Sequence, residues 1–116
     1  MSNEKVYAMP FAKIYPLYVQ KIENKGRIQA ELDAVIMWLT GYDSTGLSSQ
    51  IESNASLQTF FEEAPQINPN ASKITGSICG HKVEEIADPL MQKIRYMDKL
   101  VDELTKGKPI EKILRS

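Results

Sequence analysis

The spacing of apolar residues predicts helices along most of the chain. A first helix is expected to start at Pro10 or Pro16, because proline suits the first helical turn, and to stop at Gly26. Its apolar face, which we expect to be buried, consists of Ile14, Leu17, Tyr18 and Ile22. A second helix over residues 27–41 is expected to end at Gly41. Its apolar stripe consists of Ile28, Leu32, Val35, Ile36 and Leu39.

Shorter elements are predicted in the middle of the chain. Residues 42–56 are rich in Asp, Ser, Gly and Asn, which is typical of turns, and one helical turn fits over residues 47–51. Ser56 is expected to be the N-cap of the next helix, which Pro65 ends. The residues of that helix that we expect to be buried are Leu57, Phe60 and Phe61.

A further helix is expected to begin at Asn68 or Asn70 and to end at Gly80, so that it includes most of the sequence ITGSICG. A connection follows this helix, and in it Val83 and Ile86 are expected to point inward. This assignment places the only cysteine of the chain near a helix end and the only histidine just beyond it.

The clearest predicted element is a long helix that Asp88 caps, Pro89 begins and Gly107 ends. Its apolar residues alternate by four and three, as in a coiled-coil seam: Leu90, Ile94, Met97, Val101 and Leu104. Because this seam spans only about two heptads, packing inside a bundle fits better than an extended coiled coil. The seam is also our candidate interface. A last helical turn is expected to start at Pro109.

The whole pattern predicts an all-α fold, a single compact orthogonal bundle of five or six mostly short helices. No stretch shows the sustained alternation with period two that a half-buried strand requires. A chain of 116 residues fits one domain over residues 1–116. A hydrophobic share of 42% and a charged share of 25% are ordinary for a globular domain.

Charge and cysteine usage narrow the class of protein. The net charge of −1 is divided unevenly, with +3 in residues 1–30, −6 in residues 31–72 and +2 in residues 73–116. One cysteine excludes an internal disulfide, and we find neither a signal peptide nor an apolar run of the roughly 18 residues that a membrane helix needs. We therefore expect a cytoplasmic protein that does not enter a membrane.

Several stretches together carry a family resemblance: YAMPFAKIYPLYV, WLTGYD, ITGSICG, VEEIADPLM, IRYMDKLVDEL and KGKPIEKILRS. From about Val6 to Ser116 the chain resembles the bacterial family of small uncharacterised proteins called domain of unknown function 2200. The resemblance implies a single small, mainly helical domain. It implies no activity, cofactor or catalytic residue.

Cys79 and His81 are the first candidates for chemistry. A Cys-x-His pair could supply two metal ligands, but a zinc site needs three or four, and only carboxylates such as Glu84 remain to complete it. A nucleophile–base pair would need the two side chains to converge and a third group to orient the histidine. The simplest interpretation is a small buried thiol and a surface imidazole. We therefore expect no metal and no cofactor.

The two glycines around this cysteine allow three roles. Gly76 and Gly80 are four residues apart, so on a helix they would share one face and let another backbone approach. Alternatively, Gly80 ends the helix in the left-handed conformation and Gly76 is a packing notch. A phosphate-binding loop is the third role, but the spacing matches neither of the usual glycine motifs.

A second candidate site is the turn WLTGYD. Trp38, Tyr42 and Asp43 follow one another near a helix end, where binding residues are common. With Cys79 and His81 they could line a shallow pocket for a small molecule. The alternative is structural, with Gly41 as the helix C-cap and Asp43 forming an Asx-turn.

Charged residues of the last third are expected to lie on solvated faces. Asp98 and Asp102 are four residues apart among lysines, and Arg95 can pair with Asp98. The basic residues near the C-terminus are Lys106, Lys108, Lys112 and Arg115. With an isoelectric point near 5.8, this cluster does not reach the basic balance of a nucleic-acid binder, and we do not expect nucleic acid as a partner.

Two functional hypotheses follow. The first is a protein-interaction module that associates with itself or with an unknown protein, based on the four–three seam and on the opposed charges of the middle and the ends. The alternative is a small-molecule-binding protein or minor enzyme with a pocket between WLTGYD and ITGSICGH. We lean away from an enzyme, because no set of catalytic residues is evident.

Overall fold

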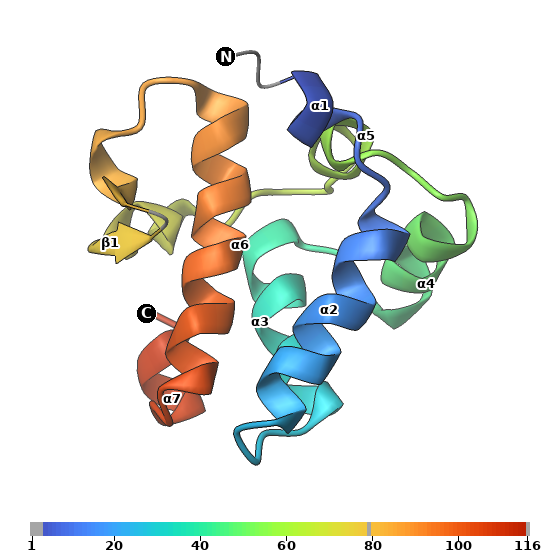
Figure 1. Ribbon diagram of the computed structural model, residues 1–116. Coiled ribbons are helices and arrows are strands. Elements are labelled where there is room, and N and C mark those ends of the chain that lie inside the picture. The colour runs from blue at the N-terminus through green and yellow to red at the C-terminus, as the bar shows by residue number, and fades with distance from the viewer. Residues whose placement is uncertain (1–3, 79, 116) are drawn as a thin grey trace.

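The computed structural model describes residues 4–78 and 80–115 (Figure 1). The α-helices in this part of the chain are α1 (Glu4–Tyr7), α2 (Phe11–Glu23), α3 (Gln29–Thr40), α4 (Ser44–Glu52), α5 (Leu57–Glu62), α6 (Pro89–Thr105) and α7 (Ile110–Ile113). Two 3-10 helices, η1 (Pro69–Lys73) and η2 (Val83–Glu85), flank an antiparallel hairpin of β1 (Ser77–Ile78) and β2 (His81–Lys82). The chain is mainly helical, as predicted. The prediction of five or six helices without strands is wrong in detail, because the described residues form seven α-helices, several of only one or two turns, and a short hairpin.

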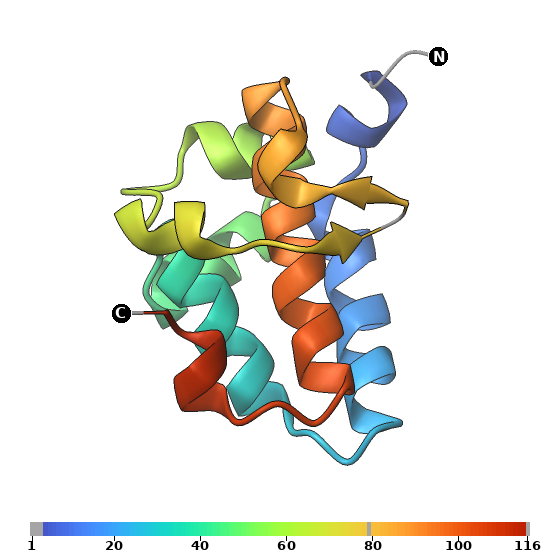
Figure 2. The ribbon, with the colours of Figure 1, turned by 90° about the vertical axis from the view of Figure 1, so that its left-hand side faces the viewer.

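Helix α6 runs through the middle of the molecule (Figures 1 and 2). It packs against α2, α3, α5 and α7, and the hairpin and η2 lie along its other side. The seam predicted for this helix is turned inward. Four of its five residues belong to the core and are at most 3% exposed: Ile94, Met97, Val101 and Leu104. Leu90, near the start of the helix, is half-buried and packs against the core.

The predicted buried face of α2 is wrong at Leu17, which is 60% exposed. The helix begins at Phe11 and carries Pro16 in its interior, on the exposed side. Its buried residues are Phe11, Tyr18 and Ile22, which recur at a spacing of seven and four. Phe11 stacks on Phe60 of α5 with ring centroids 4.1 Å apart, and this contact fixes which face turns inward.

Ile28 also departs from the predicted stripe, because α3 begins one residue later and leaves Ile28 60% exposed at the N-cap. The rest of that stripe is buried as predicted: Leu32, Val35, Ile36 and Leu39. The helix ends at Gly41, whose φ of +81° is the left-handed conformation that favours glycine. The predicted helix end is therefore confirmed.

The helix predicted over residues 68–80 is wrong beyond its first turns. Asn68 caps η1 by accepting the Asn70 N–H at 2.8 Å, as predicted, but the 3-10 helix stops at Lys73 and the hairpin follows. β-branched residues such as Ile74 and Ile78 favour extended backbone. Gly80, with φ +82°, stands directly before β2, so it belongs to the hairpin turn and not to a helix end.

Other predicted element starts are confirmed. The side chain of Ser56 accepts the Thr59 N–H at the start of α5, and Asp88 accepts the N–H groups of Leu90 and Met91 at the start of α6. Val83 is fully buried, as expected, and Ile86 is half-buried.

None of the helices in the described ranges has the length and apolar character needed to cross a membrane.

Candidate binding surface around Arg95

A pocket opens between the hairpin and the first half of α6, and we call it the hairpin pocket. Its cavity volume is about 390 Å³, which is within the range of small-molecule sites. Met91 and Arg95 line it from α6, where a spacing of four residues puts both on one face. The other lining residues come from β2, η2 and the residue after η2: His81, Lys82, Glu85 and Ile86.

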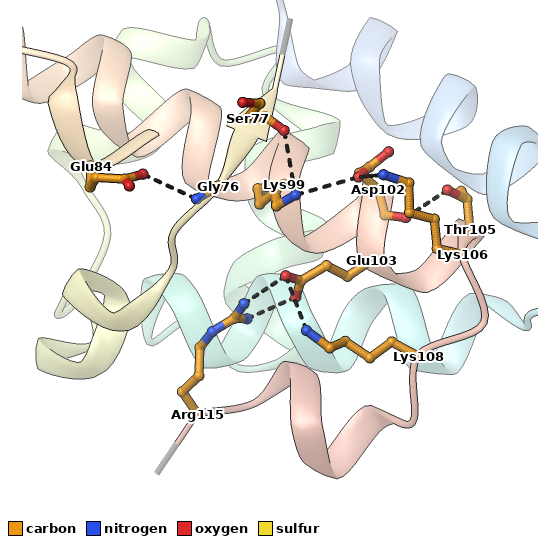
Figure 3. A network of polar contacts seen from close by, with 10 residues as sticks. All are labelled: Gly76, Ser77, Glu84, Lys99, Asp102, Glu103, Thr105, Lys106, Lys108 and Arg115. Atoms are coloured by element: carbon orange, nitrogen blue, oxygen red, sulfur yellow. Dashed lines mark hydrogen bonds and ion pairs between the residues drawn. The ribbon is translucent and has the colours of Figure 1, made fainter. Parts of the chain in front are cut away.

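Buried and hydrogen-bonded residues hold the walls of the hairpin pocket together. Val83 donates its N–H to the carbonyl of Gly76 at 3.0 Å, and its own carbonyl accepts from Gln92 Nε2 of α6 at 3.1 Å. On the other side of the hairpin, Lys99 Nζ donates to the carbonyl of Ser77 at 3.4 Å (Figure 3). The hairpin and the following η2 are thereby attached to α6 at two positions along the helix, Gln92 and Lys99.

Two carboxylates beside the pocket are used structurally. Glu84 accepts the Gly76 N–H at 3.0 Å, and the pKa of Glu84 is lowered by its own backbone N–H and then by that of Gly76. Asp88 caps α6 and accepts the Tyr7 hydroxyl of α1 at 2.6 Å. The Tyr7 hydrogen bond, followed by the backbone N–H groups, lowers the pKa of Asp88. These contacts fix the start of the helix that carries Met91 and Arg95.

Arg95 lies between the two cavities of this surface. Its Nη1 lies 2.8 Å from Asp98 Oδ2, which confirms the predicted pair, and Asp98 also accepts the hydroxyl of Tyr18 from α2. Arg95 lines the hairpin pocket on one side of α6 and an apolar groove on the other. The salt bridge with Asp98 therefore stands between two cavities of different character.

The apolar groove lies where α1, α2, α5 and α6 meet, and its volume is about 250 Å³. Leu17, 60% exposed, and Met9, 38% exposed, stand at this groove. The remaining lining residues are Val6, Ile14, Tyr18, Leu57, Ile94, Arg95 and Asp98. Exposed large apolar side chains beside an apolar groove are a feature of interaction surfaces.

The residues of the predicted WLTGYD site have structural contacts instead. Tyr42 is buried and donates its hydroxyl to the Phe60 carbonyl at 2.6 Å, and burial, followed by the charge of Glu63, raises its pKa to about 12. Asp43 accepts the Gly46 N–H at 2.7 Å and caps α4, while half-buried Trp38 packs against the core. None of these three residues is among those that line the hairpin pocket.

His81, from the second predicted segment, is an exposed residue of β2 and lines the hairpin pocket. Cys79 lies outside the described residues. Within the described ranges, no three His, Cys, Asp or Glu residues come together as a metal-binding group. Gly76 has φ +108°, and a Cβ placed there would lie 3.3 Å from the side chain of Lys99, so its close neighbour is a lysine of α6.

Three of the basic residues of the C-terminal region, Lys106, Lys108 and Arg115, pair with carboxylates of α6 (Figure 3). Arg115 makes a two-pronged contact with Glu103, at 2.8 and 2.6 Å, and Lys108 Nζ lies 3.5 Å from the same carboxylate. Lys106 Nζ lies 3.0 Å from Asp102. These pairs offset much of the positive charge that the sequence concentrates there.

Sequence reasoning missed Lys82, Glu85 and Arg95 as parts of a pocket. The sequence predicts Arg95 only as a partner of Asp98, and Lys82 follows the histidine without any motif. The sequence does contain one signal for this pocket wall: Met91 and Arg95 are four residues apart, so they share a face of the predicted helix beside its buried seam. The opposite wall could not be anticipated, because it depends on the hairpin.

The comparisons with known proteins agree with the fold described above. The chain is similar to a solved structure titled "Crystal structure of uncharacterized protein SP1917", with 43% sequence identity and a TM-score of 0.91. The match covers 98% of this chain and 93% of that one. No curated protein matches the chain. A family model described as "Uncharacterized protein conserved in bacteria (DUF2200)" matches residues 5–115. The chain therefore belongs to the bacterial family DUF2200, as the sequence resemblance indicates.

Proposed function

We propose that this protein is a self-associating module whose contact surface is the apolar groove together with Leu17. The observation that carries this proposal is that a protruding apolar side chain, 60% exposed, stands at the edge of an apolar groove on the same face. The seam of α6 does not supply this surface, since four of its five side chains lie in the core of the chain itself.

A projection and a groove on one face suit a twofold contact. In such a contact the same patch faces itself, so Leu17 of each copy enters the groove of the other. Met9 and Leu57 contribute further apolar surface, and Arg95 and Asp98 form the charged rim. This arrangement closes at two copies and leaves no unpaired groove.

The expected dimer is weak. Burial of one leucine side chain contributes about 1.5–3 kcal/mol, and the two copies contribute it twice. The loss of rotational and translational freedom opposes this gain, so we expect a dissociation constant on the order of micromolar or weaker. Because the contact is apolar, we expect association to persist at high salt, whereas a contact driven by the acidic middle segment and the basic ends would weaken.

The test compares two substitutions of equally exposed apolar residues. Leu17→Gln removes the projection and keeps a good helix former, and Ile28→Gln makes a similar change at a residue that is also 60% exposed but does not line the groove. Sedimentation velocity over a range of concentrations should show dimers for the unaltered protein and for Ile28→Gln, and monomers for Leu17→Gln.

Two results would contradict the proposal. One is a strictly monomeric unaltered protein at the highest soluble concentration. The other is equal weakening by both substitutions, which would assign association to general surface hydrophobicity. A strong loss of association at high salt would favour a contact based on charge instead.

A further inference from the structure

The later turns of α2 lie beside the start of α3 (Figure 1), and a pocket of about 320 Å³ opens there, which we call the α2–α3 pocket. This volume is at the lower end of the range for small-molecule sites. The described residues that line it are one carboxylate, three apolar or aromatic residues and three side-chain amides, with no Lys, Arg or His among them. Its chemistry therefore differs from that of the hairpin pocket, whose lining includes lysine, arginine and histidine.

The Glu23 carboxylate carries the charge of this pocket, and no cation of the described chain pairs with it. Arg27 is four residues further on, but it lies beyond the end of α2 and makes its ion pair with Glu31 at 2.8 Å. Lys21 is two residues away, and residues at that spacing do not face each other on a helix. Glu23 is also the last residue of α2, where the helix dipole adds negative potential.

Gln29 adds a neutral hydrogen-bond acceptor to the pocket. Tyr15 donates its hydroxyl hydrogen to Asp33, so the same oxygen can only accept from Gln29. Gln29 Nε2 makes that bond at 2.7 Å, which leaves Gln29 Oε1 available to accept from a ligand. The positive end of α3 beside it is offset by Glu31, which accepts the Ile28 N–H at 3.4 Å.

We propose that the α2–α3 pocket binds a small organic ammonium ion with an apolar portion. The ammonium group faces the Glu23 carboxylate and Gln29 Oε1, since both accept hydrogen bonds from such a group. The apolar portion lies against Tyr15, Pro16 and Val19, and an aromatic residue in this wall also attracts a cation. An anionic ligand is disfavoured, because the lining offers a negative charge and no cation.

The walls of the pocket are held in position by the rest of the chain. Tyr15 and Val19 are half-buried and pack against the core. Arg27, in the loop between the two helices, contacts Glu31 of α3 and donates to the carbonyl of Lys108 at 2.8 Å. A ligand would therefore meet groups whose backbone is already in position, which lowers the entropic cost of binding.

The experiment is a titration followed by amide and methyl NMR shifts, with four probes. Pentylammonium carries both features of the proposed ligand, 1-pentanol lacks the charge, methylammonium lacks the apolar portion and pentanoate has the opposite charge. We expect pentylammonium to bind most tightly and to shift the signals of residues 15–29. The shifts should include the Val19 methyl groups.

Charge-matched variants separate a site from general attraction. Glu23→Gln and Glu52→Gln each remove one exposed carboxylate from the last residue of a helix, and of the two only Glu23 lines the pocket. Glu23→Gln should weaken pentylammonium binding by about threefold to tenfold, the range between an exposed ion pair and a charge-assisted hydrogen bond. Glu52→Gln should leave the affinity unchanged, and unfolding curves of both variants should match that of the unaltered protein.

The proposal is overturned if pentylammonium shifts no signals in residues 15–29, or if both glutamate variants weaken its binding equally. Equally tight binding of 1-pentanol or pentanoate would overturn the role of the charge, and equally tight binding of methylammonium would overturn the role of the apolar wall. The test is independent of self-association, because Leu17→Gln should leave pentylammonium binding unchanged and Glu23→Gln should leave the dimer unchanged.

Discussion

Three tyrosine hydroxyls from α1 and α2 donate hydrogen bonds to carboxylates on other helices or at their ends. The pairs are Tyr7 with Asp88, Tyr15 with Asp33, and Tyr18 with Asp98. Two of them join residues 80 or 81 positions apart, so they attach the start of the chain to α6. Burial, followed by the hydrogen bond to Asp33, raises the pKa of Tyr15 to about 12.

The Tyr7–Asp88 pair gives a prediction about pH. The folded protein holds the pKa of Asp88 below its ordinary value of 3.8, chiefly through the Tyr7 hydroxyl. The stability that this shift contributes is therefore present above pH 3.8 and lost as the pH falls through the pKa of the folded state. Tyr7→Phe should raise the pKa of Asp88 towards 3.8 and reduce this acid dependence, as measured by an NMR titration of the side-chain carboxyl group.

A matched control uses another tyrosine with the same substitution. Tyr15→Phe also removes a hydroxyl that donates to a carboxylate, but its partner is Asp33. It should leave the pKa of Asp88 unchanged. If the pKa of Asp88 stays low in Tyr7→Phe, the backbone N–H groups of the cap are sufficient to lower it, and the hydroxyl is dispensable.

At the scale of the elements, Gly41 at the end of α3 has the closest neighbours of any glycine in the chain. Gly41 has φ +81°, and a Cβ built there would lie 2.9 Å from the carbonyl oxygen of Gln66 and 3.0 Å from its nitrogen. Gln66 and Asn68 donate their N–H groups to carbonyls at the end of α3, which keeps this segment close. The glycine is therefore needed both for its conformation and for space.

Gly107 allows the two requirements to be measured separately, because it shares the left-handed conformation of Gly41 but not its close neighbour. It has φ +82°, and a Cβ there would meet nothing within 4 Å. Gly107→Ala should cost about 1 kcal/mol for the left-handed conformation alone, and Gly41→Ala should cost about 2–4 kcal/mol because the Gln66 backbone must also move. Urea unfolding of both variants measures the difference. Equal losses would mean that the segment at Gln66 yields without cost.

Helix ends were the elements most accurately predicted from the sequence. Asp88 and Ser56 cap helices through bonds to residues two or three positions ahead, and Gly41 needs only its own conformation, so short-range patterns contain the information. The hairpin was missed, because two-residue strands leave no alternating pattern and the hairpin depends on α6 for support.

The burial of α2 and the candidate site depend on contacts that one sequence does not reveal. Leu17 and Phe11 are both apolar, and the stacking of Phe11 on Phe60 is what turns Leu17 outward. The hairpin pocket joins residues 81–86 with residues 91–95 around a turn, so its members are near in sequence. Their convergence became evident only when the segment proved to be extended and not helical.

At the scale of the whole molecule, a group of polar contacts holds the C-terminal segment against other parts of the chain. Arg115 pairs with Glu103 of α6, and its carbonyl accepts from Asn70 Nδ2 at 3.3 Å. Arg27, in the loop between α2 and α3, donates to the carbonyl of Lys108 at 2.8 Å. Segments from four parts of the chain thus meet around α7, which covers the lower end of α6 in Figure 1.

Glu103 is the centre of this group and gives a prediction about global stability. It is 6% exposed and lies between two cations, Arg115 and Lys108, as Figure 3 shows. Glu103→Gln keeps the shape and removes the charge, which leaves Arg115 in a largely buried position without its counter-ion. We expect a loss of about 2–4 kcal/mol, because breaking one half of a buried pair exposes the desolvation cost of the other.

Urea unfolding measures this loss, and Glu111→Gln is the matched control. Glu111 is exposed on α7, so the same substitution there should change stability by less than about 0.5 kcal/mol. Hydrogen exchange should show faster opening of α7 in Glu103→Gln than in the control, because the contact holds the end of the chain against α6. If Glu103→Gln is as stable as Glu111→Gln, desolvation of the pair cancels its attraction, and α7 is held by Ile113 in the core instead.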